Sequence, residues 1–298
     1  MKEERIFTLI YRIPLRKILK RVSKNHLKKG YRQIVMPAFD YISNEIVVDG
    51  IFERKYLETF FRWLVELDIS TEKSICIDIG ANIGNHSLYF SEYYKQVYSF
   101  EPSERIFNIL FANSKLVSNI ECFKLGCSKE DKTVLLTLGG ENLGGSFISS
   151  EEEQGETETI EVKPLDRILQ DVSNVGLIKI DVEGHEHEVL QGAEKTIRHN
   201  MPIILFEQTE KEFSDNSSPS IDFLKKTGYK NFAVLRKFPR VKGGFFKQLL
   251  FNPLLVLVFG DQTRIEIEKN IVPGFYEFII ALPDWFPLKP DKNEVTEK

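Results

Sequence analysis

The feature that most constrains the fold is an alternation of short apolar runs with helical patterns from residue 74 onward. Strands that alternate with helices form a parallel sheet covered by helices on both faces. The first five predicted strands are Ser74–Ile79, Gln96–Phe100, Asn119–Leu125, Gly176–Ile180 and Pro202–Phe206. Two later runs, Tyr229–Leu235 and Phe275–Leu282, complete a mainly parallel sheet of roughly seven strands in an α/β fold. A short β region at 33–50 and a helix at roughly Glu53–Leu67 are expected before the alternation.

The remaining segments differ in composition and divide the chain. Residues 1–45 form a basic N-terminal extension, and residues 46–290 form the main domain. Two insertions interrupt that domain. Short alternating runs at 131–162 predict a β insertion, and residues 236–272 combine basic with apolar side chains. Residues 291–298 are polar and predict a flexible tail.

Charge is distributed unevenly along the chain. The net charge is −4, whereas residues 1–40 sum to +8, because eleven Lys or Arg are set against Glu3, Glu4 and Asp40. The acidic remainder argues against a nucleic-acid partner. In residues 5–29, apolar side chains recur at helical spacing among the basic ones, so an amphipathic helix is expected. This helix either packs on the domain or makes a peripheral contact with an anionic membrane surface.

The cysteines indicate the compartment. The chain has an odd number of cysteines, and their spacing is not that of metal ligands. They are Cys76, Cys122 and Cys127. Free thiols of this kind are typical of the reducing cytoplasm. The N-terminus shows no uninterrupted apolar region followed by a small-residue cleavage site, so no secretory signal is expected. We expect a cytoplasmic protein, peripheral to the inner face of the membrane if the basic helix docks there.

A buried strand, a tight turn and a helix start follow one another in residues 75–87. Gly80 and Gly84 allow a ligand to approach the backbone closely and adopt positive φ at little cost. Asn82 tolerates the left-handed region better than most residues. Asp78, at the end of the strand, suits a ligand with an ammonium group and would repel a pyrophosphate. The cofactor-binding residues expected in this loop are Asp78, Gly80, Ala81, Asn82, Gly84 and Ser87.

A second acidic residue follows the next predicted strand. Glu101, before Pro102, lies about 20 residues beyond the glycine turn, where an acidic side chain reaches ribose hydroxyls in a Rossmann unit. Two carboxylates at these positions suit a nucleoside that carries a positive sulfonium and an amino-acid tail. The expected cofactor is therefore S-adenosyl-L-methionine. The glycines do not read G-x-G-x-x-G, which disfavours the alternative of an NAD(P)-dependent oxidoreductase. Cys127 and Ser128, just past the third strand, are expected to border the adenine.

Three blocks of the sequence resemble the FkbM family of S-adenosylmethionine-dependent methyltransferases. They are Ile77–Gly84 with Ser87, then Phe100–Pro102, then Leu177–Glu186 running into Val189–Gly192. The third block is the most distinctive, because few other methyltransferases follow the fourth strand with Asp-Val-Glu-Gly-His-Glu. The resemblance implies a Rossmann-like class I methyltransferase fold, with a methyltransferase domain at 46–290. It also implies O-methylation of a sugar, a glycan or another small-molecule natural product.

Acidic residues end the fourth and fifth predicted strands. Ligands of open α/β sheets bind beyond the carboxyl ends of the strands, so Asp181 and Glu207 are expected close together near the methyl donor. Methyl transfer to a hydroxyl requires removal of the hydroxyl proton. His185 is the expected base because its pKa range suits neutral pH. Glu183 is the rival base, and Asp181 could orient either.

The same strand ends offer oxygen ligands to a metal ion. Asp181, Glu207 and the amide of Gln208 would suit Mg²⁺, which could help to deprotonate the acceptor. A structural alternative is that the acidic residues complement the N-terminus of the helix that follows the fourth strand. An RNA methyltransferase that uses the basic N-terminus as its electrostatic footprint is a further alternative, against which the acidic body argues.

Overall fold

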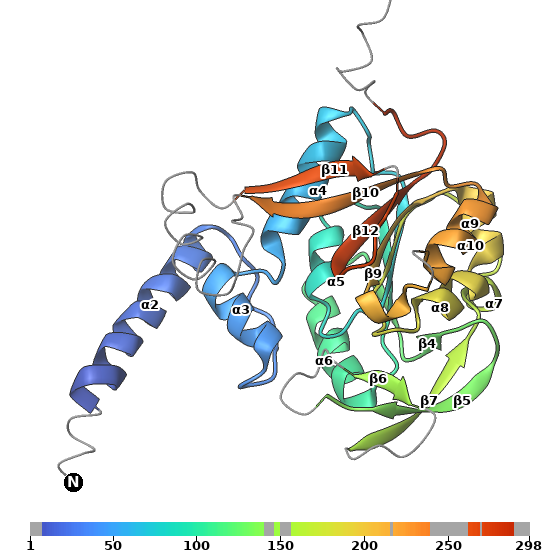
Figure 1. The fold of residues 1–298 in the computed structure, drawn as a ribbon. Coiled ribbons are helices and arrows are strands. Elements are labelled where there is room, and N and C mark those ends of the chain that lie inside the picture. The colour runs from blue at the N-terminus through green and yellow to red at the C-terminus, as the bar shows by residue number, and fades with distance from the viewer. Residues whose placement is uncertain are drawn as a thin grey trace, which may run out of the picture.

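The computed structural model describes residues 8–139, 146–149, 156–214, 217–238, 262–268 and 270–288. An eight-stranded, mostly parallel sheet forms the centre of this part of the chain, with helices on both faces (Figure 1). The strand order is β11-β10-β12-β9-β8-β1-β2-β3. The strands are β1 (Ile75–Ile79), β2 (Gln96–Phe100), β3 (Ile120–Phe123), β8 (Val175–Ile180), β9 (Ile203–Gln208), β10 (Asn231–Phe238), β11 (Gln262–Glu268) and β12 (Tyr276–Leu282).

Five neighbouring strands, in the order β9-β8-β1-β2-β3, pair in parallel. Strand β12 lies between β9 and β10 and is antiparallel to both. The expected count of roughly seven strands omitted β11, which lies within the predicted insertion at 236–272. β11 pairs antiparallel with β10 at the edge of the sheet. Its charged residues Glu266 and Glu268 form ion pairs with Arg236 across that edge. An edge strand needs only one apolar side, so its sequence lacks the continuous apolar run of the central strands.

Helices bury a separate apolar cluster on each face of the sheet. Helices α8, α9 and α10 pack on one face, and α4 and α5 pack on the other. Neighbouring residues of β1 serve different faces, since Cys76 belongs to the cluster with α4 and Ile77 to the cluster with α8. The helices are α4 (Arg54–Glu66), α5 (Asn85–Phe90), α6 (Glu104–Ser114), α7 (Leu165–Ile168), α8 (Glu186–Gly192), α9 (Glu194–Asn200) and α10 (Pro219–Thr227), with a 3₁₀ turn η3 (Glu210–Glu212).

A second, four-stranded sheet follows β3 and has the order β4-β7-β5-β6. Its strands are β4 (Gly126–Cys127), β5 (Lys132–Thr137), β6 (Phe147–Ser149) and β7 (Thr157–Lys163). These strands lie in and beside the β insertion predicted at 131–162. Leu136, Ile160 and Val162 form a small apolar cluster of their own. The second sheet therefore presents an apolar surface beside the carboxyl ends of the main strands.

The N-terminal region consists of a π-helical turn η1 (Thr8–Arg12), α2 (Ile13–Lys28) and α3 (Tyr41–Asp49). The short β region predicted at 33–50 is wrong, because local capping favours a helix there. Asp40 precedes α3, and its carboxylate accepts a hydrogen bond from the Ser43 amide at 3.2 Å. Gly50, with φ of 86°, ends the helix.

Helix α2 projects from the body of the molecule (Figure 1), and none of its residues is buried. Leu15, Ile18 and Leu19 on its apolar face are exposed, so these three side chains do not pack on the described part of the domain. No helix in the described ranges is both long and apolar enough to cross a membrane. Residues 239–261 of the predicted insertion and the predicted tail at 291–298 lie outside the described residues.

Candidate active site

A cavity of about 420 Å³ opens at the carboxyl ends of the central strands. Its lining includes two groups of residues that differ in chemistry. We call the first group the glycine wall: Gly80, Ala81, Asn82, Glu101, Pro102, Gly126 and Cys127. We call the second group the acidic wall: Glu53, Asp181, Glu183, Glu207 and Glu277. Because β12 runs antiparallel to β9, its first residues meet the carboxyl end of β9 and reach the same edge of the sheet.

The loop of the glycine wall is held in a left-handed turn. Gly80 and Asn82 have φ of 75° and 49°. The amides of Gly80 and Ala81 donate to the carbonyl of Phe100 at 3.1 and 2.9 Å. The Glu101 carboxylate accepts from the amides of Asn82 at 3.1 Å and Ser103 at 3.0 Å. Burial raises the pKa of Glu101 to about 7 in spite of these two donors.

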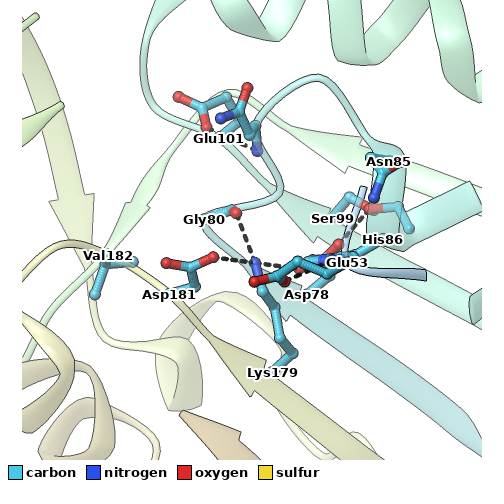
Figure 2. Close-up of polar contacts among 12 residues, drawn as sticks. Glu53, Asp78, Gly80, Asn85, His86, Ser99, Glu101, Lys179, Asp181 and Val182 are labelled. Atoms are coloured by element: carbon cyan, nitrogen blue, oxygen red, sulfur yellow. Dashed lines mark hydrogen bonds and ion pairs between the residues drawn. The ribbon is translucent and has the colours of Figure 1, made fainter. Parts of the chain in front are cut away.

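A buried polar network supports this loop from behind (Figure 2). Asp78 is fully buried, and its carboxylate accepts from the Ser87 hydroxyl at 2.5 Å. The Ser99 hydroxyl donates to Ser87 at 2.8 Å. Asp78, Gly84 and Ser87 are not among the described residues that line the cavity. The ammonium group that Asp78 meets in this structure is the side chain of Lys179, which places Asp78 behind the loop and not in the described cavity lining.

Lys179 is the central residue of the network, and sequence reasoning missed it. Its ammonium lies 3.3 Å from Asp78, 3.1 Å from Asp181 and 3.0 Å from the carbonyl of Gly80 (Figure 2). Burial lowers the pKa of Lys179, but the Asp181 and Asp78 carboxylates more than offset this effect, so its pKa lies above the ordinary value. The available signal was a charged residue inside an otherwise apolar strand, since a buried charge requires partners.

The acidic wall gathers three carboxylates at the ends of β8 and β9. Oxygen atoms of Asp181, Glu183 and Glu207 all lie within 4.8 Å of one another. Burial and then Asp181 raise the pKa of Glu183 to about 7. Burial, followed by Asp181 and Glu183, raises the pKa of Glu207 to about 9. Crowded carboxylates of this kind bind protons readily, and they could also hold a divalent cation.

Of the three predicted metal ligands, the structure brings Asp181 and Glu207 together but places Gln208 elsewhere. Gln208 is fully buried, and its side-chain carbonyl accepts from the Ser218 hydroxyl at 2.5 Å. Successive residues of a strand point to opposite faces, so Glu207 and Gln208 cannot serve one site. Glu183 takes the third position in the cluster. Its left-handed φ of 52° places it in a sparsely populated conformation, of the kind found at functional sites.

His185 lines the cavity but makes its polar contacts away from this cluster. Its Nε2 atom lies 2.9 Å from the Ser128 hydroxyl, and its Nδ1 atom lies 3.7 Å from Glu188. Burial lowers the pKa of His185, and Glu188 opposes that effect. Ser128 itself is buried and is not among the described lining residues. His185 therefore lines the cavity outside the cluster of Asp181, Glu183 and Glu207.

Two further lining residues come from parts of the chain that sequence reasoning did not connect. His86 on α5 has its Nε2 atom 3.2 Å from the Glu53 carboxylate, and both side chains are largely buried. The Asn85 side chain holds the backbone of Phe52 by accepting from its amide at 3.0 Å and donating to its carbonyl at 3.2 Å. Glu53 also has a left-handed φ of 55°. The segment before α4 is thus part of the cavity wall, which no local motif indicates.

This arrangement is the Rossmann-like class I methyltransferase fold: a mainly parallel sheet with a glycine loop after β1, an acidic residue after β2 and a cavity at the carboxyl ends of the strands. The methyltransferase FkbM domain matches residues 78–230, which is about half of the chain, and the chain belongs to that family. The matched range contains the glycine loop, Glu101 and the block from Asp181 to Glu186.

The chain is also similar to individual proteins. The chain is 30% identical over 146 residues to Methyltransferase 1 of Beauveria bassiana, covering 41% of this chain and 59% of that protein. It is 27% identical over 176 residues to Methyltransferase sdnD of Sordaria araneosa, covering 47% and 68%. A solved structure of an FkbM methyltransferase from Methylobacillus flagellatus is 20% identical, with a TM-score of 0.36 and coverage of 55% and 41%. The matched region thus spans about six-tenths of the Beauveria relative.

Proposed function

We propose that the chain transfers the methyl group of S-adenosylmethionine to a hydroxyl group of a sugar, a glycan or another polyhydroxylated natural product. The observation that carries the proposal is the pairing of a glycine wall with an acidic wall in one cavity. Family membership supports methyl transfer, and the acidic wall supports an acceptor that donates hydrogen bonds. The crowded carboxylates also argue against RNA as the acceptor, because its phosphates would be repelled.

The glycine wall fits the proposed cofactor. Gly80, Ala81 and Asn82 would hold the methionine end, and Glu101 would accept hydrogen bonds from the ribose hydroxyls. Gly126 and Cys127 would border the adenine. When bound, the sulfonium supplies an electrophilic methyl group to the cavity. The carboxylates of the acidic wall favour a positive charge next to them.

The acidic wall and its rim would position the acceptor. Asp181, Glu183 and Glu207 can accept hydrogen bonds from neighbouring hydroxyls of a sugar ring, and Glu183 is the group placed to take the proton. Tyr41 and Phe275 line the cavity and are 56% and 61% exposed, so each offers an apolar ring face to an incoming molecule. Positioning of this kind supplies much of the rate enhancement in a displacement reaction.

Calorimetric titration tests the cofactor assignment. We expect saturable heat with S-adenosylmethionine and with its demethylated product, and no heat with NADH. Incubation of the protein with methyl-labelled cofactor and hydroxylated glycans should then give a labelled ether. Clean binding of NADH with no binding of either sulfur nucleoside would refute the proposal. Label on a nitrogen atom of the product would retain the cofactor but refute the hydroxyl acceptor.

A Gly80→Ala variant should lose cofactor affinity by at least about tenfold, which equals about 1.4 kcal/mol. A Cβ at Gly80 would lie 1.8 Å from the carbonyl oxygen of Asp181, so the loop must move. Gly30→Ala is the matched control, because Gly30 has nearly the same φ of 78° and its Cβ would meet no described atom within 4 Å. Both variants carry the φ penalty of about 1–2 kcal/mol. Equal cofactor affinities in titration calorimetry would contradict the close approach at Gly80.

A further inference from the structure

Helix α2 presents a narrow apolar stripe that is exposed along most of its length in the described structure, with half-buried Val22 at its end. Leu15, Ile18, Leu19 and Val22 follow the i, i+3, i+4, i+7 spacing and therefore lie on one face of the helix. Leu15, Ile18 and Leu19 are 54%, 59% and 40% exposed. A surface helix of a globular protein would bury such a stripe against its own domain. Among the described residues, this helix leaves Leu15, Ile18 and Leu19 open to solvent.

The rest of the helix surface is basic. Between Thr8 and Lys29 the sequence contains eight Lys or Arg and neither Asp nor Glu. At 100° per residue, the basic side chains of α2 occupy the faces that flank and oppose the apolar stripe. They are Arg16, Lys17, Lys20, Arg21, Lys24 and Lys28. A helix that combines an exposed apolar stripe with a wide basic face has the properties of an interfacial helix at an anionic bilayer.

The base of the helix and the residues after it contact the segment that leads to the cavity. His26 contacts the carbonyl of Val47 in α3 through its Nε2 atom at 3.1 Å. Tyr31 accepts a hydrogen bond from Arg54, the first residue of α4, at 2.7 Å. The chain then continues through α3 to Phe52 and Glu53, which line the cavity. Docking of the helix would therefore hold the catalytic domain close to the surface that it binds.

We propose that α2 docks the protein on an anionic membrane surface, with the apolar stripe inserted below the headgroups and the basic side chains among them. A second copy of the helix is a poor occupant of the same face, because the two basic surfaces would repel each other. Docking is independent of the proposed methyl transfer. It would favour acceptors that are themselves attached to, or concentrated at, the membrane.

Vesicle flotation of the full chain tests docking. We expect the protein to float with phosphatidylcholine vesicles that contain phosphatidylserine, and to remain at the bottom with phosphatidylcholine alone. Raised salt should release it, since each Lys or Arg near the surface contributes about 1 kcal/mol. Failure to float with the anionic vesicles, or equal flotation with both kinds, would overturn the proposal.

Two variants distinguish binding through the apolar stripe of α2 from binding through any exposed apolar side chain. The combined substitution Leu15→Ser, Ile18→Ser and Leu19→Ser should weaken binding to anionic vesicles at least about tenfold. These residues are not buried, so the fold should survive, which circular dichroism and cofactor titration verify. Val65→Ser is the control, because Val65 is 71% exposed on α4. A triple variant that binds vesicles as well as Val65→Ser would show that α2 is not the docking element.

Discussion

Replacing Glu183 by Gln is expected to lower kcat by about 10²–10⁴-fold while leaving the affinity for S-adenosylmethionine unchanged. The substitution keeps the size of the side chain and one accepting oxygen, but it removes the ability to accept the hydroxyl proton. Glu183 lies in the carboxylate cluster with Asp181 and Glu207, and its raised pKa of about 7 makes it a better base than an ordinary carboxylate. Single-turnover kinetics with labelled cofactor measure the effect.

Comparison variants identify the role of the cluster. Because His185 contacts Ser128, His185→Gln should change kcat by less than about tenfold. Glu194→Gln is the surface control, since Glu194 pairs with Arg198 across an exposed turn of α9, away from the described cavity lining. A Glu183→Gln variant with turnover close to that of the unaltered protein would eliminate Glu183 as the base. Activity that disappears with a chelator and returns with Mg²⁺ would assign the cluster to metal binding instead.

The glycine wall could be predicted from the sequence because its conformation is set locally. Gly80 and Asn82 adopt positive φ within a turn of a few residues, and Glu101 follows the neighbouring parallel strand. In a parallel sheet the carboxyl ends of adjacent strands lie at the same edge. Once the strand order is predicted from the sequence, the residues that follow these strands are therefore predicted to lie close together. The same reasoning correctly placed Asp181 near Glu207.

The rest of the cavity depends on contacts between distant segments. Glu53 contacts His86 beside the point where the Asn85 side chain holds the chain ahead of α4, and the sequence contains no pattern for that pairing. Gln208 was placed in the metal site on the basis of adjacency, although strand alternation sends it toward Ser218. The expectation that Asp78 meets a ligand rests on its local motif, which does not reveal its distant partner Lys179.

Lys179→Met should destabilise the protein by about 3–5 kcal/mol, the usual cost of removing one partner from a buried ion pair. Asp78 is fully buried, and without the ammonium it would keep an uncompensated charge next to Asp181. The carbonyl of Gly80 would also lose its donor, so the glycine wall should loosen. Denaturant unfolding monitored by circular dichroism gives the change in free energy.

Two companion variants show whether burial of the charge is the cause. Lys230→Met removes the exposed pair with Asp284, where both side chains are more than half accessible, and should cost no more than about 1 kcal/mol. Adding Asp78→Asn to Lys179→Met removes the uncompensated charge, so the double variant should lose less stability than the sum of the two single variants. Strict additivity would mean that Asp78 and Lys179 do not stabilise each other. The loop would then owe its conformation to its other hydrogen bonds, which include those of Gly80 and Ala81 with Phe100 and that of Asn82 with Glu101.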